Sequence, residues 1–342
     1  SFSRFPDMGA ICSKKKERPS DTPVRKEKKP EKEKEKEKEC GDLSRFVTFT
    51  LEKGVAGIRQ EFDDIKAKTV PQKEDCVFFN RQANAAKNRY KDVQCCDNNR
   101  IILKEESMGT DYIHANYCGT MTDPKRFICC QGPLKNTIND FWSMVWFEES
   151  EFVVMLCNFT EMGKAKCAEY FPQNENEIFL AGNASLKCLS LVKEEWPATI
   201  SIRKIEIEKI DLGQKRTITH IHWESWPDRG CPPVDNSMYK LLDMTGRSLR
   251  PIIVHCSAGI GRTGTAVATH MATEMVEAGL YLDNGISDLV KKMRKQRAGS
   301  VQNDQQYLFI YRILLHKFMK DSEKSDPKFE QFCKDYDTAT LA

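Results

Sequence analysis

The sequence has no apolar run that reaches the ~18 residues of a membrane-spanning helix. It also lacks a Cys-x-x-Cys pair and any spaced histidine cluster of the kind that holds structural zinc. The loop GxxxxGK[ST], which binds nucleoside triphosphates with magnesium, is missing as well. We therefore expect no spanning segment, no metal and no cofactor.

A disulfide scaffold is disfavoured, although the chain has 14 cysteines. At 342 residues the chain is long, and two cysteine pairs are adjacent, Cys95 with Cys96 and Cys129 with Cys130. No secretory hydrophobic segment opens the sequence. We expect reduced thiols and a cytoplasmic location.

Positive charge is concentrated near the start of the chain. Residues 14–39 hold 12 Lys or Arg and 8 Asp or Glu, a net of +4, whereas the whole chain sums to only +3. No aromatic residue interrupts this run, so it lacks the stacking partners of single-strand nucleic-acid binders, and we expect no nucleic-acid partner. Because it has no apolar face to bury, residues 1–42 are predicted to be a tail or linker, either disordered or a transient charged helix.

From residue 43 the composition becomes typical of a globular domain. Ile58, Phe62 and Ile65 recur at helical spacing, and Thr137 is a candidate N-cap for a second helix. Apolar or alternating runs predict strands near 152–156, 200–207, 217–223 and 251–255. Further helices are expected after Arg262 and over 285–297 and 303–320.

This mixture of strands and helices, with no repeat of fixed period, predicts one α/β domain over residues 43–320. Residues 321–342 are rich in Lys, Asp and Glu, and we expect them to form a loose C-terminal tail. A single self-contained domain favours a monomer.

The sharpest local feature is VHCSAGIGRTG, residues 254–264, in which a buried strand leads into a glycine-rich loop and then a helix. Glycines allow the loop to turn its N–H groups inward, and the helix N-terminus adds its positive end. Such a loop binds phosphate. Cys256 opens it, and Arg262 closes it after five intervening residues.

The pairing of Cys256 with Arg262 has a chemical logic. The loop amides, the helix dipole and Arg262 all stabilise negative charge, so we expect a Cys256 thiolate well below the ~8.5 pKa of a free thiol. Arg262 can hold two phosphoryl oxygens and follow the charge into the transition state. The alternative, a buried cysteine at a tight turn, is disfavoured because His255, Thr263 and three glycines complete the pattern.

HCSAGIGRTG resembles the signature of the protein tyrosine phosphatases, and the similarity extends over essentially all of residues 43–320. Six further segments follow the family's order and resemble its phosphotyrosine-recognition loop, its DYINA and QGP motifs, its mobile glutamate loop, its substrate-closing loop and its glutamine segment. They are KNRYKDV (87–93), DYIHANY (111–117), QGPLKNTINDFW (131–142), TEMGKAKCAEYFP (160–172), WPDRGCP (226–232) and VQNDQQY (301–307).

The resemblance implies a single-domain fold, with a highly twisted mixed central sheet flanked by helices and the phosphate loop between a central strand and a helix. It also implies a protein-tyrosine phosphatase with Cys256 as nucleophile, Arg262 stabilising the transition state and Asp228 as general acid. Trp226 would set the hinge of the loop that carries Asp228. Thr263 would place a hydroxyl near the sulfur to help it leave.

By the same resemblance, Gln302 and Gln306 would position the water that hydrolyses a cysteinyl-phosphate. Tyr90 would line the pocket and stack on the substrate ring, with Asp92 on the substrate backbone. A pocket walled by an aromatic side chain in this way would be deep enough to admit phosphotyrosine, whereas phosphoserine would not reach the nucleophile. The loop itself would hold the phosphoryl group through Ser257, Ala258, Gly259, Ile260 and Gly261.

Supporting roles are implied for three more residues. His255 would be a structural histidine behind the thiolate, Glu161 would orient Arg262, and Lys166 would orient Asp228. His114 departs from the family pattern, in which DYINA has asparagine, so a structural hydrogen bond is expected to differ.

A second phosphotyrosine pocket is implied at Arg59, Arg294 and Gly299, where some family members build one. Two other functions remain open at this point. A binding-only pseudophosphatase would typically lose the cysteine, the arginine or the acid, all of which are present. A dual-specificity or lipid phosphatase would share the cysteine loop without the full set of motifs.

The stretch MGAICSKKK, residues 8–16, carries a conditional membrane signal. If translation starts at Met8, Gly9 fits the pattern M-G-x-x-x-S of N-myristoylation, with Ser13 at the required position. One acyl chain binds membranes only weakly, so palmitoylation of Cys12 and attraction of the adjacent lysines to anionic lipid would be needed as well. The partners implied are tyrosine-phosphorylated proteins and, under that condition, a membrane surface.

Overall fold

The computed structural model describes residues 31–340, apart from 108, 121, 196–197, 229, 281–284 and 320–322. The lipidation signal at Gly9 and Cys12 lies outside the described residues. Within the described part of the chain, no helix has the length and apolarity to cross a membrane.

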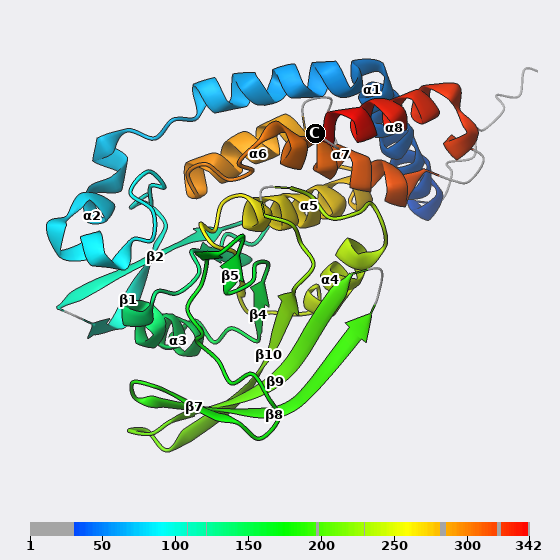
Figure 1. Ribbon diagram of the computed structural model, residues 1–342. Helices are drawn as coiled ribbons and strands as arrows, with labels where there is room; N and C mark the ends of the chain where they lie inside the picture. The colour runs from blue at the N-terminus through cyan, green and yellow to red at the C-terminus, as the bar shows by residue number, and fades with distance from the viewer. Residues whose placement is uncertain are drawn as a thin grey trace, which may run out of the picture.

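A nine-stranded mixed sheet forms the centre of the molecule and twists from one edge to the other (Figure 1). Its strand order is β1-β2-β3-β11-β4-β10-β9-β8-β7, and a separate hairpin pairs β5 with β6. The strands are β1 (Arg100–Ser107), β2 (Thr110–Cys118), β3 (Phe127–Cys130), β4 (Phe152–Met155), β5 (Thr160–Glu161), β6 (Lys164–Ala165), β7 (Ile178–Ala181), β8 (Ala184–Glu195), β9 (Thr199–Lys209), β10 (Gln214–Trp223) and β11 (Ile252–His255).

The helices α1, α5, α6, α7 and α8 lie together on one side of this sheet (Figure 1). The helix α3 packs against β1 instead. The helices are α1 (Glu31–Lys68), α2 (Val77–Asn80), α3 (Ile138–Phe147), α4 (Ser237–Thr245), α5 (Arg262–Glu277), α6 (Gly285–Gln296), α7 (Asp304–Phe318) and α8 (Pro327–Thr340), with 3-10 turns η1 (Lys73–Cys76), η2 (Gln82–Lys87), η3 (Lys135–Thr137) and η4 (Glu323–Ser325).

The four central strands run parallel, and this determines where the site forms. β3, β11, β4 and β10 are neighbours in parallel pairs, so their carboxyl ends meet at one edge of the sheet. The residues that follow them belong to four motifs identified in the sequence. The QGP segment follows β3, the glutamate loop follows β4, the WPD loop follows β10, and Cys256 follows β11.

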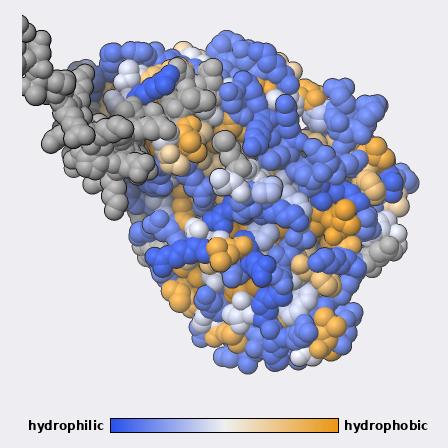
Figure 2. All heavy atoms as spheres, turned by 180° about the vertical axis from the view of Figure 1, so that it is seen from behind, coloured by the Kyte–Doolittle hydropathy of each residue, from blue (hydrophilic) through white to orange (hydrophobic). Residues whose placement is uncertain are grey.

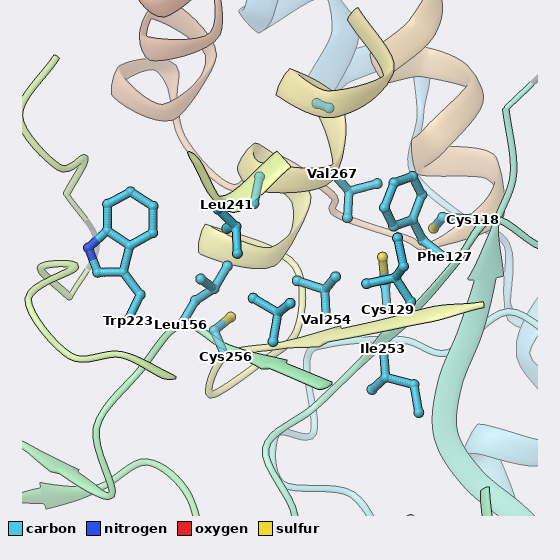
Figure 3. Packing of buried hydrophobic residues seen from close by; sticks show 14 of the residues in the cluster. Cys118, Phe127, Cys129, Leu156, Trp223, Leu241, Ile253, Val254, Cys256 and Val267 are labelled. Carbon is cyan, nitrogen blue, oxygen red and sulfur yellow. The ribbon is translucent and has the colours of Figure 1, made fainter. Parts of the chain in front are cut away.

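All four residues of β11 are buried, as the apolar run predicted. Val254 points to the face where α5 contributes Val267, and Ile253 points to the opposite face (Figure 3). The strand that delivers the candidate nucleophile is therefore packed on both sides. Seen from behind, the surface is mainly hydrophilic, with apolar side chains in separate patches (Figure 2).

The helices expected over 285–297 and 303–320 are present as α6 and α7, and the four expected strands are present as β4, β9, β10 and β11. Thr137 occupies the N-cap position of α3, but its side chain makes no capping hydrogen bond. Its hydroxyl instead accepts a hydrogen bond from the Leu134 N–H at 2.9 Å.

The expectation of a loose tail over 321–342 is wrong, because α8 occupies most of it and buries Phe329, Phe332 and Tyr336. These aromatic residues recur at helical spacing among charged ones, which is the pattern of an amphipathic helix. The charged composition of the segment does not reveal this pattern. At the other end, α1 begins at Glu31, inside the segment assigned to the linker. Part of the predicted linker is therefore helical and continues into the domain as α1. This helix changes direction at Gly54, where φ is 63°.

Candidate active site

The loop after β11 wraps its backbone around the Cys256 sulfur. The Gly259 N–H donates a hydrogen bond to Cys256 Sγ at 3.3 Å. Gly259 has φ of +70°, and a Cβ there would lie 2.0 Å from the Cys130 carbonyl oxygen. Only glycine fits this position, because both the backbone angle and the space exclude a side chain.

The Cys256 sulfur is almost completely buried, and burial alone would raise its pKa. The Arg262 charge and the polar groups of Thr263 and Gly259 outweigh burial, so the pKa of the Cys256 thiol lies below its ordinary value. The Thr263 hydroxyl is buried without a hydrogen bond of normal geometry among the described residues. Cys256 is thus suited to act as a thiolate nucleophile.

Arg262, the first residue of α5, is held by a bidentate ion pair. Its Nη1 and Nη2 donate to the two carboxylate oxygens of Glu161 at 2.6 and 2.8 Å. Nη1 also donates to the Trp226 carbonyl at 3.1 Å, and Nη2 lies 3.4 Å from Asp228 Oδ1. Burial opposes its charge, but Glu161 and Cys256 more than compensate and raise the pKa of Arg262.

Asp228 reaches the site from the WPD loop and is held there by Lys166, whose Nζ lies 2.5 Å from its Oδ2. Trp226 is buried, stacks edge-on against Trp223 at 5.0 Å and donates from Nε1 to the Gly230 carbonyl at 3.2 Å. The indole thus packs the base of the loop while the carboxyl faces the site.

A cavity of about 200 Å³ opens above Cys256. It brings together residues from five separate motifs, and all but Val93 among them were expected from the sequence. Its lining consists of Tyr90, Asp92, Val93, Lys166, Asp228, Cys256, Ser257, Ala258, Gly261, Arg262, Gln302 and Gln306. Ile260, Gly259, Thr263, His255, Glu161 and Trp226 do not line it.

Tyr90 stands at the wall of this cavity and is fixed by a relay of hydroxyls. Ser257 Oγ donates to the Lys166 carbonyl at 2.9 Å, so the Tyr90 hydroxyl donates to Ser257 Oγ at 2.8 Å. The recognition loop is further fixed by Gln131, whose side chain bonds the Arg89 N–H and the Lys87 carbonyl. Asp92 is exposed at the rim.

Gln302 and Gln306 approach the phosphate loop at Gly261. A Cβ on Gly261 would lie 2.9 Å from Gln302 Oε1 and 3.1 Å from Gln306 Nε2. The Gln306 side chain accepts a hydrogen bond from the Gln302 N–H at 2.9 Å. Val301, just before them, has φ of 59°, a strained conformation for a β-branched residue.

His255 belongs to a buried chain of hydrogen bonds behind the loop. Its Nδ1 lies 3.2 Å from the Cys256 carbonyl and donates to it, so Nδ1 carries the proton of the neutral ring. Nε2 therefore accepts from the Tyr170 hydroxyl at 2.6 Å. Tyr170 then accepts from His220 Nε2 at 2.7 Å. Burial lowers the pKa of His255 to about 3, so its ring is neutral and supports the loop rather than transferring a proton.

His114 also proves to be structural. It is buried, and its Nε2 bonds the Val93 carbonyl at 2.8 Å, at the end of the recognition loop. Burial lowers its pKa to about 3, and the neutral ring donates this hydrogen bond.

The residues expected to form a second phosphotyrosine pocket are engaged in other contacts. Arg59 pairs with Asp304 at 2.7 Å, and the Arg294 guanidinium lies over the Phe62 ring. Gly299 lies beside the phosphate loop, where a Cβ would be 3.3 Å from Ile260 Cδ1. The second pocket therefore stays a prediction.

One functional residue not predicted from the sequence is Arg297, which is fully buried and binds the backbone of the phosphate loop. It donates to the carbonyls of Gly259 and Ala258 at 3.1 and 3.0 Å, and to Asn116 Oδ1 at 2.9 Å. Nothing in the spacing around Arg297 distinguishes it from the other basic residues of α6 and the turn that follows. Among the described residues, no group of three or more His, Cys, Asp or Glu is placed to hold a metal ion.

Comparison with known proteins assigns the family. The family model described as protein-tyrosine phosphatase matches residues 84–316, and the chain belongs to this family. Human tyrosine-protein phosphatase non-receptor type 18 is 33% identical over 288 residues, which are 79% of this chain and 60% of that protein. The tyrosine-protein phosphatase 1 of Caenorhabditis elegans is 36% identical over 246 residues, 69% of this chain and 23% of its own.

Solved structures agree with this assignment. A structure of PTPN18 in complex with HER2 phosphor-peptides has a TM-score of 0.74 at 30% identity and covers 82% of this chain and all of its own. The crystal structure of the human type 18 catalytic domain has a TM-score of 0.69 at 32% identity and covers 77% and 97%. The expected single-domain fold is confirmed. The chain spans 60% of the length of the human type 18 protein and 62% of the length of its mouse counterpart.

Proposed function

We propose that the protein is a protein-tyrosine phosphatase that hydrolyses phosphotyrosine in proteins through a cysteinyl-phosphate intermediate, in signalling. The observation that carries this proposal is one cavity lined by both Cys256 and Asp228, with Arg262 locked between them by Glu161. Nucleophile, general acid and charge stabiliser are thereby placed around a space of about 200 Å³.

In the first step the Cys256 thiolate attacks phosphorus while the bond from phosphorus to the tyrosyl oxygen breaks. Asp228 gives its proton to that oxygen, so tyrosine leaves as a neutral phenol. Arg262 and the loop N–H groups stabilise the charge on the phosphoryl oxygens in the transition state. The ion pair with Glu161 fixes the guanidinium in the plane that this contact requires.

In the second step a water attacks the phosphocysteine and Asp228 takes its proton. The bond from phosphorus to sulfur breaks, which regenerates the thiolate and releases inorganic phosphate. Gln302 and Gln306 lie against the loop at Gly261 and are suited to orient this water. The buried Thr263 hydroxyl is suited to stabilise the departing sulfur.

Tyrosine specificity is proposed from the wall of the cavity. Tyr90 is held by Ser257 and stands beside the opening, so an aromatic ring can lie against it while the phosphate reaches Cys256. A phosphoserine is shorter by a ring and would not reach. Asp92, exposed at the rim, can accept hydrogen bonds from the backbone of a bound peptide.

The test uses purified protein with phosphotyrosine and phosphoserine peptides in the presence of EDTA. We expect release of phosphate from the tyrosine peptide only, resistance to EDTA, and loss of activity in Cys256→Ser. Cys333→Ser is the matched control, because this thiol lies on α8 away from the cavity. A wild-type protein without EDTA-resistant activity on phosphotyrosine would contradict the proposal.

For location, the proposal is a cytoplasmic monomer that is held at a membrane only if Met8 starts the chain and Gly9 is myristoylated. This rests on the sequence pattern together with Cys12 and the lysines that follow it. Mass spectrometry of the native N-terminus tests it. An unmodified peptide that spans residues 5–18 would exclude the anchor.

A further inference from the structure

A second pocket, of about 590 Å³, is lined by residues from the end of α1, from η1, from the segment after the recognition loop and from α6. Its lining is mostly charged or polar and includes one thiol, that of Cys96. The activity proposed above does not use this pocket. The question is what its thiol does.

Cys96 has a second cysteine directly behind it. Cys76 is fully buried at the end of η1, and its Sγ donates to Cys96 Sγ at 3.9 Å. A disulfide needs the two sulfur atoms at about 2.05 Å, so the two side chains must move towards each other for the bond to form. Cys96 is among the residues that line the pocket, whereas Cys76 lies fully buried behind it, which is the order of an attacking and a resolving thiol.

The backbone keeps the two thiols adjacent. The Asp97 N–H donates to the Asp75 carbonyl at 2.8 Å, which ties together the residues next to each cysteine. The Asp97 carboxylate also accepts from the Val77 and Phe78 N–H groups at 2.6 and 3.1 Å, at the start of α2. Three hydrogen bonds thus hold the two segments in register without any covalent link.

The electrostatics assign different roles to the two sulfur atoms. The hydrogen bond from Cys76 and the Arg297 charge lower the pKa of Cys96, although burial opposes them. The same hydrogen bond, with burial, raises the pKa of Cys76. Cys96 is therefore the better nucleophile of the pair.

The neighbouring Cys95 is excluded from this chemistry. Its thiol points the other way and donates to Asn116 Oδ1 at 3.3 Å. Burial raises its pKa to about 11, so it stays protonated. Of two adjacent cysteines, only Cys96 is suited to react.

We propose that Cys76 and Cys96 form a redox modification site, which hydrogen peroxide converts to a disulfide independently of the catalytic cysteine. The Cys96 thiolate attacks the peroxide oxygen and breaks the O–O bond, which gives a sulfenic acid and, with one proton, water. Cys76 then attacks that sulfur and displaces hydroxide, which takes up the Cys76 proton and leaves as a second water. Two thiols are oxidised and one peroxide is reduced.

The site is connected to the catalytic loop through one side chain. Asn116 Nδ2 donates to the Cys96 carbonyl at 2.8 Å, and Asn116 Oδ1 accepts from Arg297, which holds Ala258 and Gly259. The disulfide would therefore form at one end of a continuous chain of hydrogen bonds that ends on the phosphate loop.

The experiment treats the full chain carrying Cys256→Ser with graded hydrogen peroxide, blocks free thiols and maps tryptic peptides by mass spectrometry. The expected product links the peptides of residues 74–81 and 92–100 and disappears on reduction with dithiothreitol. It should form in Cys95→Ser and be lost in Cys96→Ser and in Cys76→Ala. Circular dichroism verifies that each variant is folded, and urea-unfolded protein should lose the preference for this pair.

Two results would overturn the proposal. One is oxidation of Cys96 to sulfinic acid in the folded protein without a linked peptide. The other is a link to Cys76 that survives in Cys96→Ser, which would assign the chemistry to Cys95. Because Cys256 is absent from the protein tested, neither result depends on whether the protein is an active phosphatase.

Discussion

Glu161 and Arg262 meet as two planar groups, with Oε1 accepting from Nη1 and Oε2 accepting from Nη2 of the guanidinium. Glu161 lies on β5, in the loop after β4, and Arg262 begins α5 after β11. Parallel neighbouring strands therefore deliver the two halves of one ion pair. The orientation of the charge that would contact a phosphoryl group depends on a residue outside the cavity lining.

Replacing Glu161 should therefore impair catalysis more than substrate binding. We expect Glu161→Gln to lower kcat on a phosphotyrosine peptide about 10-fold and Glu161→Ala about 100-fold, because a 1 Å displacement of a positioning group can cost that much. Steady-state kinetics measure both. Glu169→Gln, in the same segment but outside the described contacts, is the control. If the Glu161 variants raised KM and left kcat unchanged, a positioning role would be contradicted.

Asp228→Asn should show dependence on the leaving group. General acids contribute roughly 10²- to 10⁴-fold, so we expect a loss in that range on phenyl phosphate. The loss should be much smaller on para-nitrophenyl phosphate, whose leaving group needs little help from a proton. Comparison of the two substrates in single-turnover assays checks this. Equal losses on both would remove Asp228 from the role of acid.

Arg297→Met should destabilise the protein as well as disable it. The substitution leaves the Ala258 and Gly259 carbonyls without their Arg297 donor, at roughly 1–3 kcal/mol for each buried group left unsatisfied, and leaves Asn116 Oδ1 with only the Cys95 thiol. Urea unfolding measures this loss, and Arg250→Met is the matched surface control because its side chain is half exposed. A stable but inactive Arg297→Met protein would show that the contacts matter for geometry alone.

Stability should fall as pH drops below about 6.5, the ordinary pKa of histidine. Burial lowers the pKa of His114 and His255 to about 3 and that of His222 to about 4, so the unfolded chain binds protons that the folded protein excludes. The stabilisation is present above pH ~6.5 and is lost towards pH 4, by about 1.4 kcal/mol per pH unit for each ring.

Urea unfolding from pH 7.5 to 5 measures this slope. His114→Gln keeps a donor for the Val93 carbonyl but removes one titrating group, so its slope should be shallower by one ring. A free energy of unfolding that does not change over this range would contradict burial of the neutral rings.

Removing the apolar face of α8 should destabilise the catalytic domain. Phe332 is buried in the main core, so Phe332→Ala should cost about 3 kcal/mol. Lys334→Ala, exposed on the same helix, should cost less than about 0.5 kcal/mol. Thermal or urea unfolding of the two variants checks this, and equal stability would mean that α8 is dispensable.

The sequence predicted the parts of the fold that have strong local patterns. β11 is short and entirely apolar, and α6 has a clear amphipathic stripe, so both were found within a residue or two. β8 and α8 were not predicted, because charged side chains interrupt their apolar positions. In α8 the aromatic residues recur at helical spacing, but the Lys, Asp and Glu residues around them are typical of a loose tail.

The site divides in the same way. Cys256 and Arg262 were located from their fixed spacing in a glycine-rich loop, and Asp228 from the resemblance of its segment to a family motif. Arg297, Asn116 and Tyr170 act through contacts made only after folding, since each bonds a partner far away along the chain. No local pattern encodes such contacts.

The backbone contact between α5 and the segment before α7 fixes the glutamines in a different way from the general acid. A Cβ on Gly264 would lie 2.5 Å from the Val301 nitrogen, so no side chain fits between the phosphate loop and the glutamines. Asp228, by contrast, is held by charges on Lys166 and Arg262. Ionic strength should thus act on the position of Asp228, which serves both steps, while the glutamines keep a geometry that salt cannot screen.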